Sequence, residues 1–153
     1  MTIISYSPTL REDFEEMLVE YFCTDLQSDI PQDIVRSKLV GHILNYVQNH
    51  IIHLALAVEE ENLIGFSIYQ IDTAESDWCK RPGWGFIREF HIRRPYRGRG
   101  NGKQLASYTE QHLRNMGATQ LYLTSDNAIG FWENCGWCNT HEQCSNDLEI
   151  LTK

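Results

Sequence analysis

The chain has 153 residues, 42% of them hydrophobic, with a formal charge of −8 and a pI near 5.1. This length allows one well-buried core, and neither a linker nor a low-complexity segment indicates a second domain. The lack of a long apolar run or a basic leader predicts a cytoplasmic protein with no membrane partner, and the excess of acids argues against nucleic acid as a partner.

Seven strands and four helices are predicted from the spacing of apolar residues and from Gly, Pro and Ser breaks. In chain order they are a strand at 2–6, helices from Ser7 to about Phe22 and from Pro31 to about Val47, strands at 51–58, 63–71 and 84–92, a helix up to Met116, a strand at 121–124, a helix at 126–135, and strands at 137–143 and 148–152. This order combines hairpins with a strand-helix-strand crossover. It predicts an α/β fold of the α+β type, a mixed, mostly antiparallel sheet of six to seven strands with about four helices on both faces.

A basic, glycine-containing loop follows the strand at 84–92. Three of the residues between Arg97 and Lys103 are glycines, which let the backbone turn tightly so that successive N–H groups can point at one anion. The helix that begins there adds its own N–H groups and its positive dipole end. Eight of the 13 lysines and arginines lie between Lys80 and Lys103, where Glu89 is the only acid. The loop therefore predicts a site for a phosphorylated cofactor.

Two common phosphate motifs do not fit the spacing of this loop. The dinucleotide fingerprint GxGxxG would need a glycine in place of Lys103. The ATP/GTP loop GxxxxGK[ST] would need a glycine in place of Arg97 and a hydroxyl in place of Gln104. Both motifs are therefore excluded.

Residues 97–102 instead match the pattern Arg/Gln-x-x-Gly-x-Gly/Ala. This pattern resembles the coenzyme A loop of the GNAT superfamily of N-acetyltransferases. Residues 92–102 as a whole are similar to that family's strand-loop-helix block, and residues 128–137 are similar to its helix-to-strand segment. The resemblance implies a single acetyltransferase domain over residues 1–153, with a GNAT-like sheet and acetyl-CoA as co-substrate.

The resemblance also implies which residues hold acetyl-CoA. The pyrophosphate would lie on the amides of residues 97–102, and the pantetheine arm would pair with the backbone of residues 90–92. The cofactor-binding residues expected on this basis are Phe90, His91, Ile92, Arg97, Gly98, Arg99, Gly100, Asn101, Gly102, Lys103, Ser125, Asn127 and Trp132. No metal ligand is expected among them.

The acceptor implied is a primary amine of a small molecule or a peptide, which attacks the thioester directly in a ternary complex. Because such an amine is mostly protonated at neutral pH, a base is needed, and Glu89 is the candidate as the only carboxylate in the basic stretch. An alternative is that Glu89 pairs with Arg88 or another arginine and only orders the strand. The backbone N–H of Ile92 is the candidate donor to the developing negative charge. Reserve candidates by residue type alone are His91, His53, Tyr69 and Tyr122.

Two positions depart from the family pattern. Trp132 stands where many members have a tyrosine that protonates the departing thiolate, and an indole N–H is too weak an acid for that role. Ser125 stands where many members have an asparagine, although Asn127 is close by. Water, Tyr108 or Cys135 could replace the missing acid, and a catalytically impaired protein that only binds CoA is an alternative function.

A group of cysteines and a histidine gives a further alternative. Cys135, Cys138, His141 and Cys144 recur every three residues, which could indicate a metal site, and the first two have the spacing of a thiol-redox motif. The resemblance places them at a helix end and along one strand. Alternate side chains of a strand point to opposite faces, which argues against convergence on one ion.

The acceptor side and the oligomeric state are less well defined. A cationic amine would be attracted by the acidic residues of the first half, unless these belong to solvated loops. The acids considered for this role are Asp25, Asp29, Asp33, Glu59, Glu60, Glu61, Asp72, Glu75 and Asp77. An edge strand near the C-terminus could pair with a second copy, which leaves a homodimer open.

Overall fold

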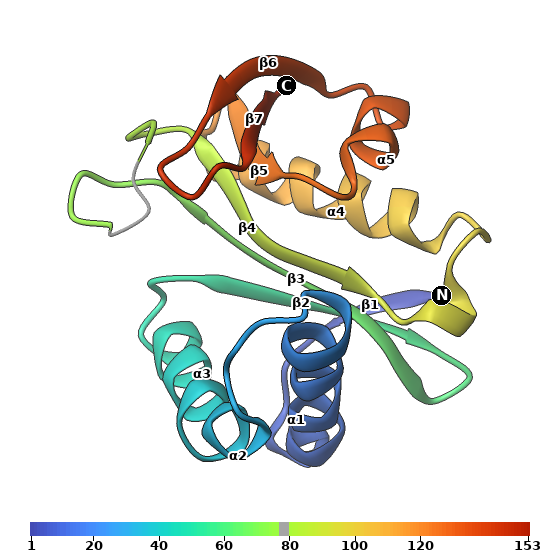
Figure 1. Cartoon of the computed structure of the whole chain (residues 1–153). Coiled ribbons are helices and arrows are strands. Elements are labelled where there is room, and N and C mark those ends of the chain that lie inside the picture. The colour runs from blue at the N-terminus through green and yellow to red at the C-terminus, as the bar shows by residue number, and fades with distance from the viewer. Residues whose placement is uncertain (77–79) are drawn as a thin grey trace. The chain divides into compact units, whose positions relative to one another are not determined.

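The computed structural model describes residues 1–76 and 80–153 (Figure 1). The strands are β1 Thr2–Ser5, β2 His53–Glu59, β3 Asn62–Ile71, β4 Gly85–Ile92, β5 Leu121–Ser125, β6 Cys138–Gln143 and β7 Glu149–Thr152. The α-helices are α1 Arg11–Val19, α2 Gln32–Ile34, α3 Val40–Gln48, α4 Asn101–Asn115 and α5 Ile129–Asn134. Short 3₁₀ turns are η1 Pro8–Leu10 and η4 Arg94–Tyr96, and π-helical segments are η2 Glu20–Asp25 and η3 Val35–Leu39.

The seven strands form one mixed sheet in the order β1-β2-β3-β4-β5-β7-β6. The pairs β1–β2, β5–β7 and β6–β7 are antiparallel. β4 and β5 are parallel and are connected by α4, which is the predicted strand-helix-strand crossover. The predicted order of elements and the mixed sheet are therefore confirmed. β6 lies at one edge of the sheet, as expected for a strand near the C-terminus, and a homodimer stays a prediction.

The chain divides into two compact units, and the boundaries between them fall inside β3, inside β4 and near the start of α4. Unit 1 comprises residues 1–66 and 90–102, and unit 2 comprises residues 67–89 and 103–153. The expectation of a single domain over residues 1–153 stays a prediction. In the part of the chain that the structure describes, no helix combines the length and hydropathy needed to span a bilayer.

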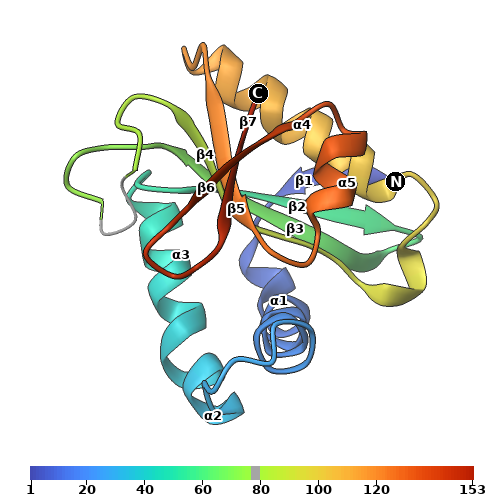
Figure 2. The same cartoon turned by 45° about the horizontal axis from the view of Figure 1, so that its top comes forward.

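In unit 1, α1 and α3 pack against the same face of β1 and β2 (Figure 2). The apolar positions predicted for the first helix form its inner face, where Phe14, Met17 and Leu18 are fully buried. The ring of Phe14 meets Phe66 of β3 edge to face, with centroids 6.0 Å apart. Tyr21 packs on the same Phe66 ring at 5.2 Å. These contacts fix the position of η2, which continues α1.

The first two predicted helices contain π-helical turns that the apolar spacing does not indicate. In η2 the N–H of Leu26 donates to the carbonyl of Tyr21, five residues earlier, at 2.9 Å. Residues five apart in an α-helix point about 140° away from each other, whereas the wider π turn reduces this angle. Glu20 and Asp25 consequently both reach the ring of His91.

Unit 2 is built on the parallel pair β4–β5 and the antiparallel strands that follow it. The parallel ladder joins residues 85–87 to residues 121–123. Phe86 of β4 stacks on Tyr122 of β5, with ring centroids 4.5 Å apart. α4 ends two residues before Gly117, whose φ of +103° confirms the predicted helix stop.

Candidate functional site

The glycine-containing loop lies between β4 and α4 as predicted, and its residues 97–100 are exposed. Gly98 and Gly100 have φ angles of +74° and +86°. A left-handed backbone of this kind costs a residue with a side chain about 1–2 kcal/mol. A β carbon added at either position would meet nothing within 4 Å among the described residues. The glycines therefore permit the turn and leave space next to the backbone.

The backbone N–H groups of this loop are available to a ligand. Those of Gly98, Arg99 and Gly100 donate to no acceptor in residues 1–76 and 80–153. α4 begins at Asn101, and the first N–H groups of an α-helix have no intrahelical acceptor. Adjacent N–H groups at the positive end of a helix dipole bind anions, so the N–H groups of residues 98–102 suit the pyrophosphate of acetyl-CoA. The amide of Arg97, which was also expected to contact the pyrophosphate, instead donates to the carbonyl of Arg94 at 3.2 Å.

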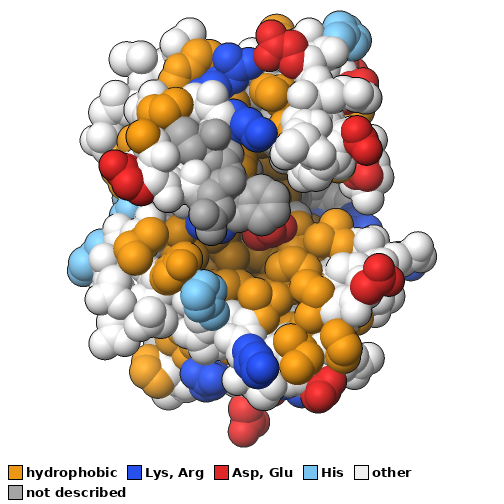
Figure 3. Space-filling view, turned by 60° about the vertical axis from the view of Figure 1, so that its left-hand side comes forward, with side chains coloured by type: hydrophobic (Ala, Val, Ile, Leu, Met, Phe, Trp, Pro, Cys, Tyr) orange, Lys and Arg blue, Asp and Glu red, His pale blue; other side chains and the backbone are white. Residues whose placement is uncertain are grey.

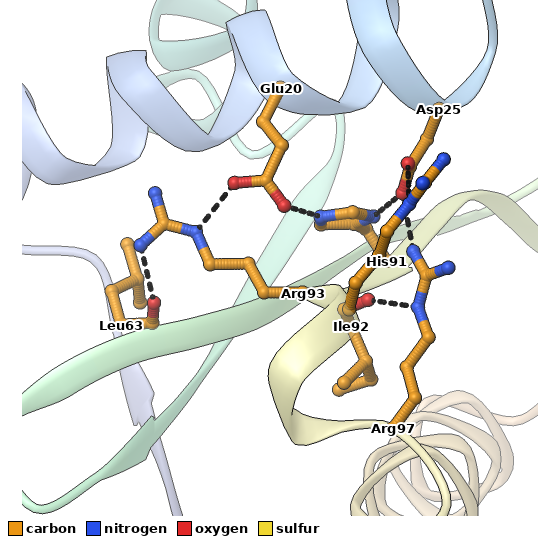
Figure 4. A network of polar contacts seen from close by, with 8 residues as sticks. Glu20, Asp25, Leu63, His91, Ile92, Arg93 and Arg97 are labelled. Carbon is orange, nitrogen blue, oxygen red and sulfur yellow. Dashed lines mark hydrogen bonds and ion pairs between the residues drawn. The ribbon is translucent and has the colours of Figure 1, made fainter.

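Three arginines just after β4 are held by carboxylates of η2 (Figure 4). Arg97 and Arg94 pair with the two oxygens of Asp25, the Nε of Arg94 at 3.0 Å. The Nε of Arg93 lies 3.1 Å from Oε2 of Glu20. These three cations therefore have carboxylate partners within unit 1, and not every cation of the basic stretch is left for a ligand.

Two other cations of the loop have a different environment. Arg99 and Lys103 are exposed and form no ion pair with any residue that the structure describes. The guanidinium of Arg99 lies over the ring of Tyr96, with 5.8 Å between its central carbon and the ring centroid. These two side chains are available for the phosphates of a coenzyme.

Asn101 holds the far end of the loop. It is a buried residue whose Nδ2 donates to the carbonyl of Tyr96 at 3.1 Å and to Oε2 of Glu59 at 3.2 Å. Its side chain therefore fixes the start of α4, and a contact with the coenzyme would come from its backbone.

His91 is buried between two carboxylates, with 3% of its surface exposed. Its Nε2 lies 3.4 Å from Oε1 of Glu20, and its Nδ1 lies 3.4 Å from Oδ2 of Asp25. Burial lowers the pKa of His91 to about 4, because desolvation of the charged ring outweighs the attraction of Asp25. The ring is therefore a weak base at neutral pH and is enclosed by the protein, which argues against a role in removing the proton of the amine.

Asp25 is charged at neutral pH. Its burial acts to raise its pKa, but the hydrogen bonds and positive charges of Arg97 and Arg94 outweigh that effect. The pKa of Asp25 therefore lies below its ordinary value.

Glu89, the predicted base, is a half-buried residue of β4. The neighbouring Arg88 donates to Oε1 of Gln70 at 2.9 Å. Successive side chains of a strand point to opposite faces, so a pair between Glu89 and Arg88 does not fit this geometry. The role of Glu89 as a base stays a prediction.

The downstream site residues belong to unit 2. The N–H of Asn127, an exposed residue, donates to the carboxylate of Asp126 at 2.6 Å. The Oγ of Ser125, which is buried, accepts from the backbone three residues later at 3.3 Å. These turns delay the start of α5 by three residues relative to the prediction. Trp132 is buried and packs edge to face on Trp137 at 5.5 Å. Coenzyme contacts of Ser125, Asn127 and Trp132 stay predictions.

The two reserve tyrosines are engaged in buried hydrogen bonds in unit 2. The hydroxyl of Tyr69 lies 2.5 Å from Nδ1 of His112, and burial raises the pKa of Tyr69. The hydroxyl of Tyr122 donates to Oδ2 of Asp72 at 2.5 Å. Both rings are fully buried, which argues against direct contact with an acceptor. His53 is a half-buried residue at the start of β2.

The acidic residues of the first half do not all face solvent. Asp72 is buried and accepts from Tyr122, and Asp25 is occupied by arginines, so neither contributes to a surface that attracts an amine. Asp77 lies outside the described residues. Of the nine acids expected on the acceptor side, those that are exposed are Asp29, Asp33, Glu60, Glu61 and Glu75.

Unit 1 also has an open, apolar groove of about 310 Å³. Figure 3 shows hydrophobic side chains gathered on this face, in the lower part of the view. The groove is lined by Ile30, Ile34, Lys38, Leu39 and His42. These residues follow η2 in the chain. The sequence predicted a helix after Pro31 with Ile34 and Leu39 among its apolar positions, but it did not indicate a groove.

The four cysteines that the structure describes, Cys23, Cys135, Cys138 and Cys144, are free thiols. Cys135 ends α5, Cys138 begins β6, and Cys144 follows that strand. Within the described ranges, no group of three or more His, Cys, Asp or Glu residues is arranged to hold a metal ion. Burial raises the pKa of Cys135 and of Cys144, which lowers the thiolate fraction that redox chemistry needs.

Comparisons with known proteins agree with this geometry. The sequence profile of the Acetyltransferase (GNAT) family matches residues 11–137. No curated protein sequence matches the chain.

Several solved structures resemble this one over nearly the whole chain. PaiA N-acetyltransferase from Thermoplasma acidophilum in complex with coenzyme A is 16% identical, with 99% of this chain and 97% of that chain covered and a TM-score of 0.74. Aminoglycoside 6′-N-acetyltransferase complexed with coenzyme A is 15% identical, with 100% and 96% covered and a TM-score of 0.73. Ribosomal-protein-alanine N-acetyltransferase from Brucella melitensis is 11% identical, with 100% and 99% covered and a TM-score of 0.72. At these identities the likeness establishes the fold.

Proposed function

Since the chain belongs to the GNAT acetyltransferase family, we propose that it transfers the acetyl group of acetyl-CoA to a primary amine, which attacks directly in a ternary complex. The observation that carries this proposal is the exposed loop at residues 97–100, with its two left-handed glycines and with available N–H groups at Gly98, Arg99 and Gly100. Acetyl-CoA supplies an activated acetyl group. The chain supplies binding, orientation and proton transfer.

The residues that would hold acetyl-CoA fall into three groups. The amides of residues 98–102 bind the pyrophosphate, and the side chains of Arg99 and Lys103 attract the phosphates. The backbone of residues 90–92 pairs with the pantetheine arm. The residues expected to add contacts are Ser125, Asn127 and Trp132.

Glu89 is the group we assign to proton removal, directly or through a water molecule. An amine with an ordinary pKa reaches the site mostly protonated, and a carboxylate on β4 can accept that proton. The backbone N–H of Ile92 donates to the acetyl oxygen as negative charge develops there. No strong acid is required for the leaving group, because a thiolate is a stable anion, so Trp132 in place of a tyrosine does not exclude catalysis.

The acceptor is inferred to be a cationic amine of a small molecule or a peptide. The exposed acids of the first half support a positively charged acceptor. The groove of unit 1 supports an acceptor with an apolar part. Two structural neighbours are named for aminoglycosides and for the alanine of a ribosomal protein, so both amine types belong in a substrate screen.

We also infer that the protein works in the cytoplasm as one domain. The four described cysteines form no disulfide, which supports a reducing compartment. The family match extends through both units, which supports one functional domain. The edge strand β6 is where a second copy could pair, if the protein forms a homodimer.

An amine screen with acetyl-CoA tests the proposed function. Thiol release is followed with a polyamine, an aminoglycoside, a free amino acid, and peptides with an N-terminal alanine or a lysine. We expect release above the rate of acetyl-CoA hydrolysis with at least one amine class, and an equal amount of acetylated amine by mass spectrometry. Tight CoA binding without transfer to any amine would instead support the non-catalytic CoA-binding alternative.

A further inference from the structure

We propose that Asp25 is a positioning residue for the coenzyme loop, which it shapes by holding Arg97. The inference rests on the assignment of residues 97–102 to the coenzyme. Asp25 is the last residue of η2 and precedes Arg97 by 72 positions in the chain. Its contribution to this loop is therefore made by the fold and not by a local motif.

One carboxylate contacts three successive parts of the segment that leads into the loop (Figure 4). Oδ2 of Asp25 lies 3.4 Å from Nδ1 of His91, at the end of β4. Oδ1 accepts from the Nε of Arg94 in η4 at 3.0 Å. Oδ2 also accepts from Nη2 of Arg97, where the loop begins. Asp25 therefore fixes the path of the backbone from residue 91 to residue 97.

Arg97 is held on two sides at once. Its Nε donates to the carbonyl of Ile92 at 2.6 Å, while its Nη2 pairs with Asp25. The planar guanidinium suits this arrangement, because its donors have a fixed fork geometry. The motif arginine is thus used to close the turn that begins the loop. We assign its effect on the coenzyme to loop shape and not to a direct contact with phosphate.

The environment of the pair favours a strong interaction. The side chain of Asp25 is 11% exposed, so few waters compete for its oxygens, whereas that of Arg97 is 47% exposed. The arginines keep the pKa of Asp25 below its ordinary value, so the pair is charged at neutral pH, and charge-assisted hydrogen bonds are the stronger kind.

The loop depends on its two ends. Gly98 and Gly100 have no side chain that could hold the middle of the loop, and no described residue lies within 4 Å of where their β carbons would be. Asn101 anchors the far end, to Tyr96 and Glu59. Loss of Asp25 would release the near end of the loop. The N–H groups of the loop would then no longer be held in one arrangement for an anion.

A double-mutant cycle with calorimetric titration of CoA tests the inference. Asp25→Ala is expected to weaken CoA binding about five- to tenfold, and Arg97→Ala by a similar factor. The double variant should bind CoA no more weakly than Arg97→Ala, because both changes remove the same constraint. Thermal unfolding and circular dichroism establish that each variant is folded.

Glu20→Gln is the matched control. Glu20 lies on the same π-helical segment and contacts the same histidine, but it pairs with Arg93 and not with Arg97. We expect this variant to lose thermal stability and to keep its CoA affinity within about twofold, since the loop anchor is intact. A structural role of Asp25 alone would make the two variants alike in both measurements.

The outcomes separate this inference from the proposed function. Wild-type protein that gives no heat with CoA would overturn the proposed function and the inference with it. Wild-type binding combined with unchanged or tighter binding by Asp25→Ala would overturn the inference alone, as would additive losses in the double variant. If Asp25→Ala does not fold, Asp25→Asn with Arg97→Lys completes the same cycle and is judged by the same criteria.

Discussion

The two sides of the segment that follows β4 have similar basic sequences and different environments. We call the side that pairs with η2 the inner side: Arg93, Arg94 and Arg97 form ion pairs with carboxylates of η2. On the outer side, Arg99 and Lys103 are exposed and pair with no carboxylate of the described residues. The difference indicates that a cation in a binding motif is fully available to a ligand only where no carboxylate of the protein already pairs with it. We therefore expect outer-side changes to alter coenzyme affinity and inner-side changes to alter stability or loop shape.

Glu89→Gln separates proton transfer from coenzyme binding, and we expect it to have the largest effect. A general base contributes about 10²–10⁴-fold, so kcat should fall about 100-fold while CoA affinity changes by less than about twofold. The rate is measured by thiol release at saturating acetyl-CoA with an amine that the screen identifies. An unchanged kcat and pH–rate profile would remove Glu89 from the mechanism.

The folded protein should lose stability in weak acid, because His91 is buried beside Glu20 and Asp25. The pKa of His91 is about 4 in the folded protein and ordinarily 6.5, so the unfolded state binds the proton more tightly. The stability that neutral His91 provides is present above pH 6.5 and is lost as the pH falls toward 4. We expect the free energy of unfolding to fall by about 2 kcal/mol between pH 7 and pH 5, measured by urea denaturation.

The control for this prediction is His91→Gln, which cannot titrate. Asp25 does not contribute in the same range, because its pKa is lowered from 3.8 and its stabilising charge is lost only at lower pH. An equal loss of stability between pH 7 and pH 5 in His91→Gln and in the wild type would contradict the assignment to His91.

Gly100→Ala tests whether the backbone of the loop contributes to CoA binding. The added methyl group would strain a residue with φ of +86° and would occupy space that the protein leaves open. We expect CoA binding to weaken about tenfold, as loop strain and contact with the diphosphate act together. Gly41→Ala in α3 is the control, because its β carbon also meets nothing within 4 Å among the described residues. Equal CoA affinity in the two variants would contradict the proposed role of the loop.

The outer cations should have the smallest individual effects. Arg99→Ala and Lys103→Ala are each expected to weaken CoA binding about threefold, and the double variant should show a shallower dependence on salt. Arg36→Ala is the control, since Arg36 lies in η3 and pairs with Glu16 of α1 at 2.6 Å. If titrations at several salt concentrations give the double variant the wild-type salt dependence, these cations do not contact the coenzyme phosphates.

Most of the fold could be predicted from local patterns. Helical spacing ahead of Gly117 and the glycines after Arg97 predicted α4 and the loop, because both depend on neighbouring residues. The π turn of η2 could not be predicted. Apolar residues up to Tyr21 keep the spacing of an ordinary helix, and the change in hydrogen bonding begins only there. The joint position of Glu20 and Asp25 beside His91 was missed for that reason.

The backbone conformation of the candidate site was predicted well, and the partners of its side chains were predicted less well. The spacing of Gly98 and Gly100 identified the cradle, since a tight turn is a local property. The partner of Arg97 lies 72 residues away, so the sequence did not show that this arginine pairs with Asp25. Asp72 was expected on an acidic surface, but it is buried and accepts a hydrogen bond from the hydroxyl of Tyr122 in β5. Contacts between distant segments decide these roles.

The claim that residues 97–102 hold the diphosphate of acetyl-CoA is tested most directly by calorimetric titration of the wild-type protein with CoA and with pantetheine. Pantetheine has the thiol arm of CoA and lacks the diphosphate and the nucleotide. We expect saturable CoA binding that weakens as the salt concentration rises, and much weaker binding of pantetheine. Equal affinity for the two compounds, or no heat with CoA, would contradict the claim.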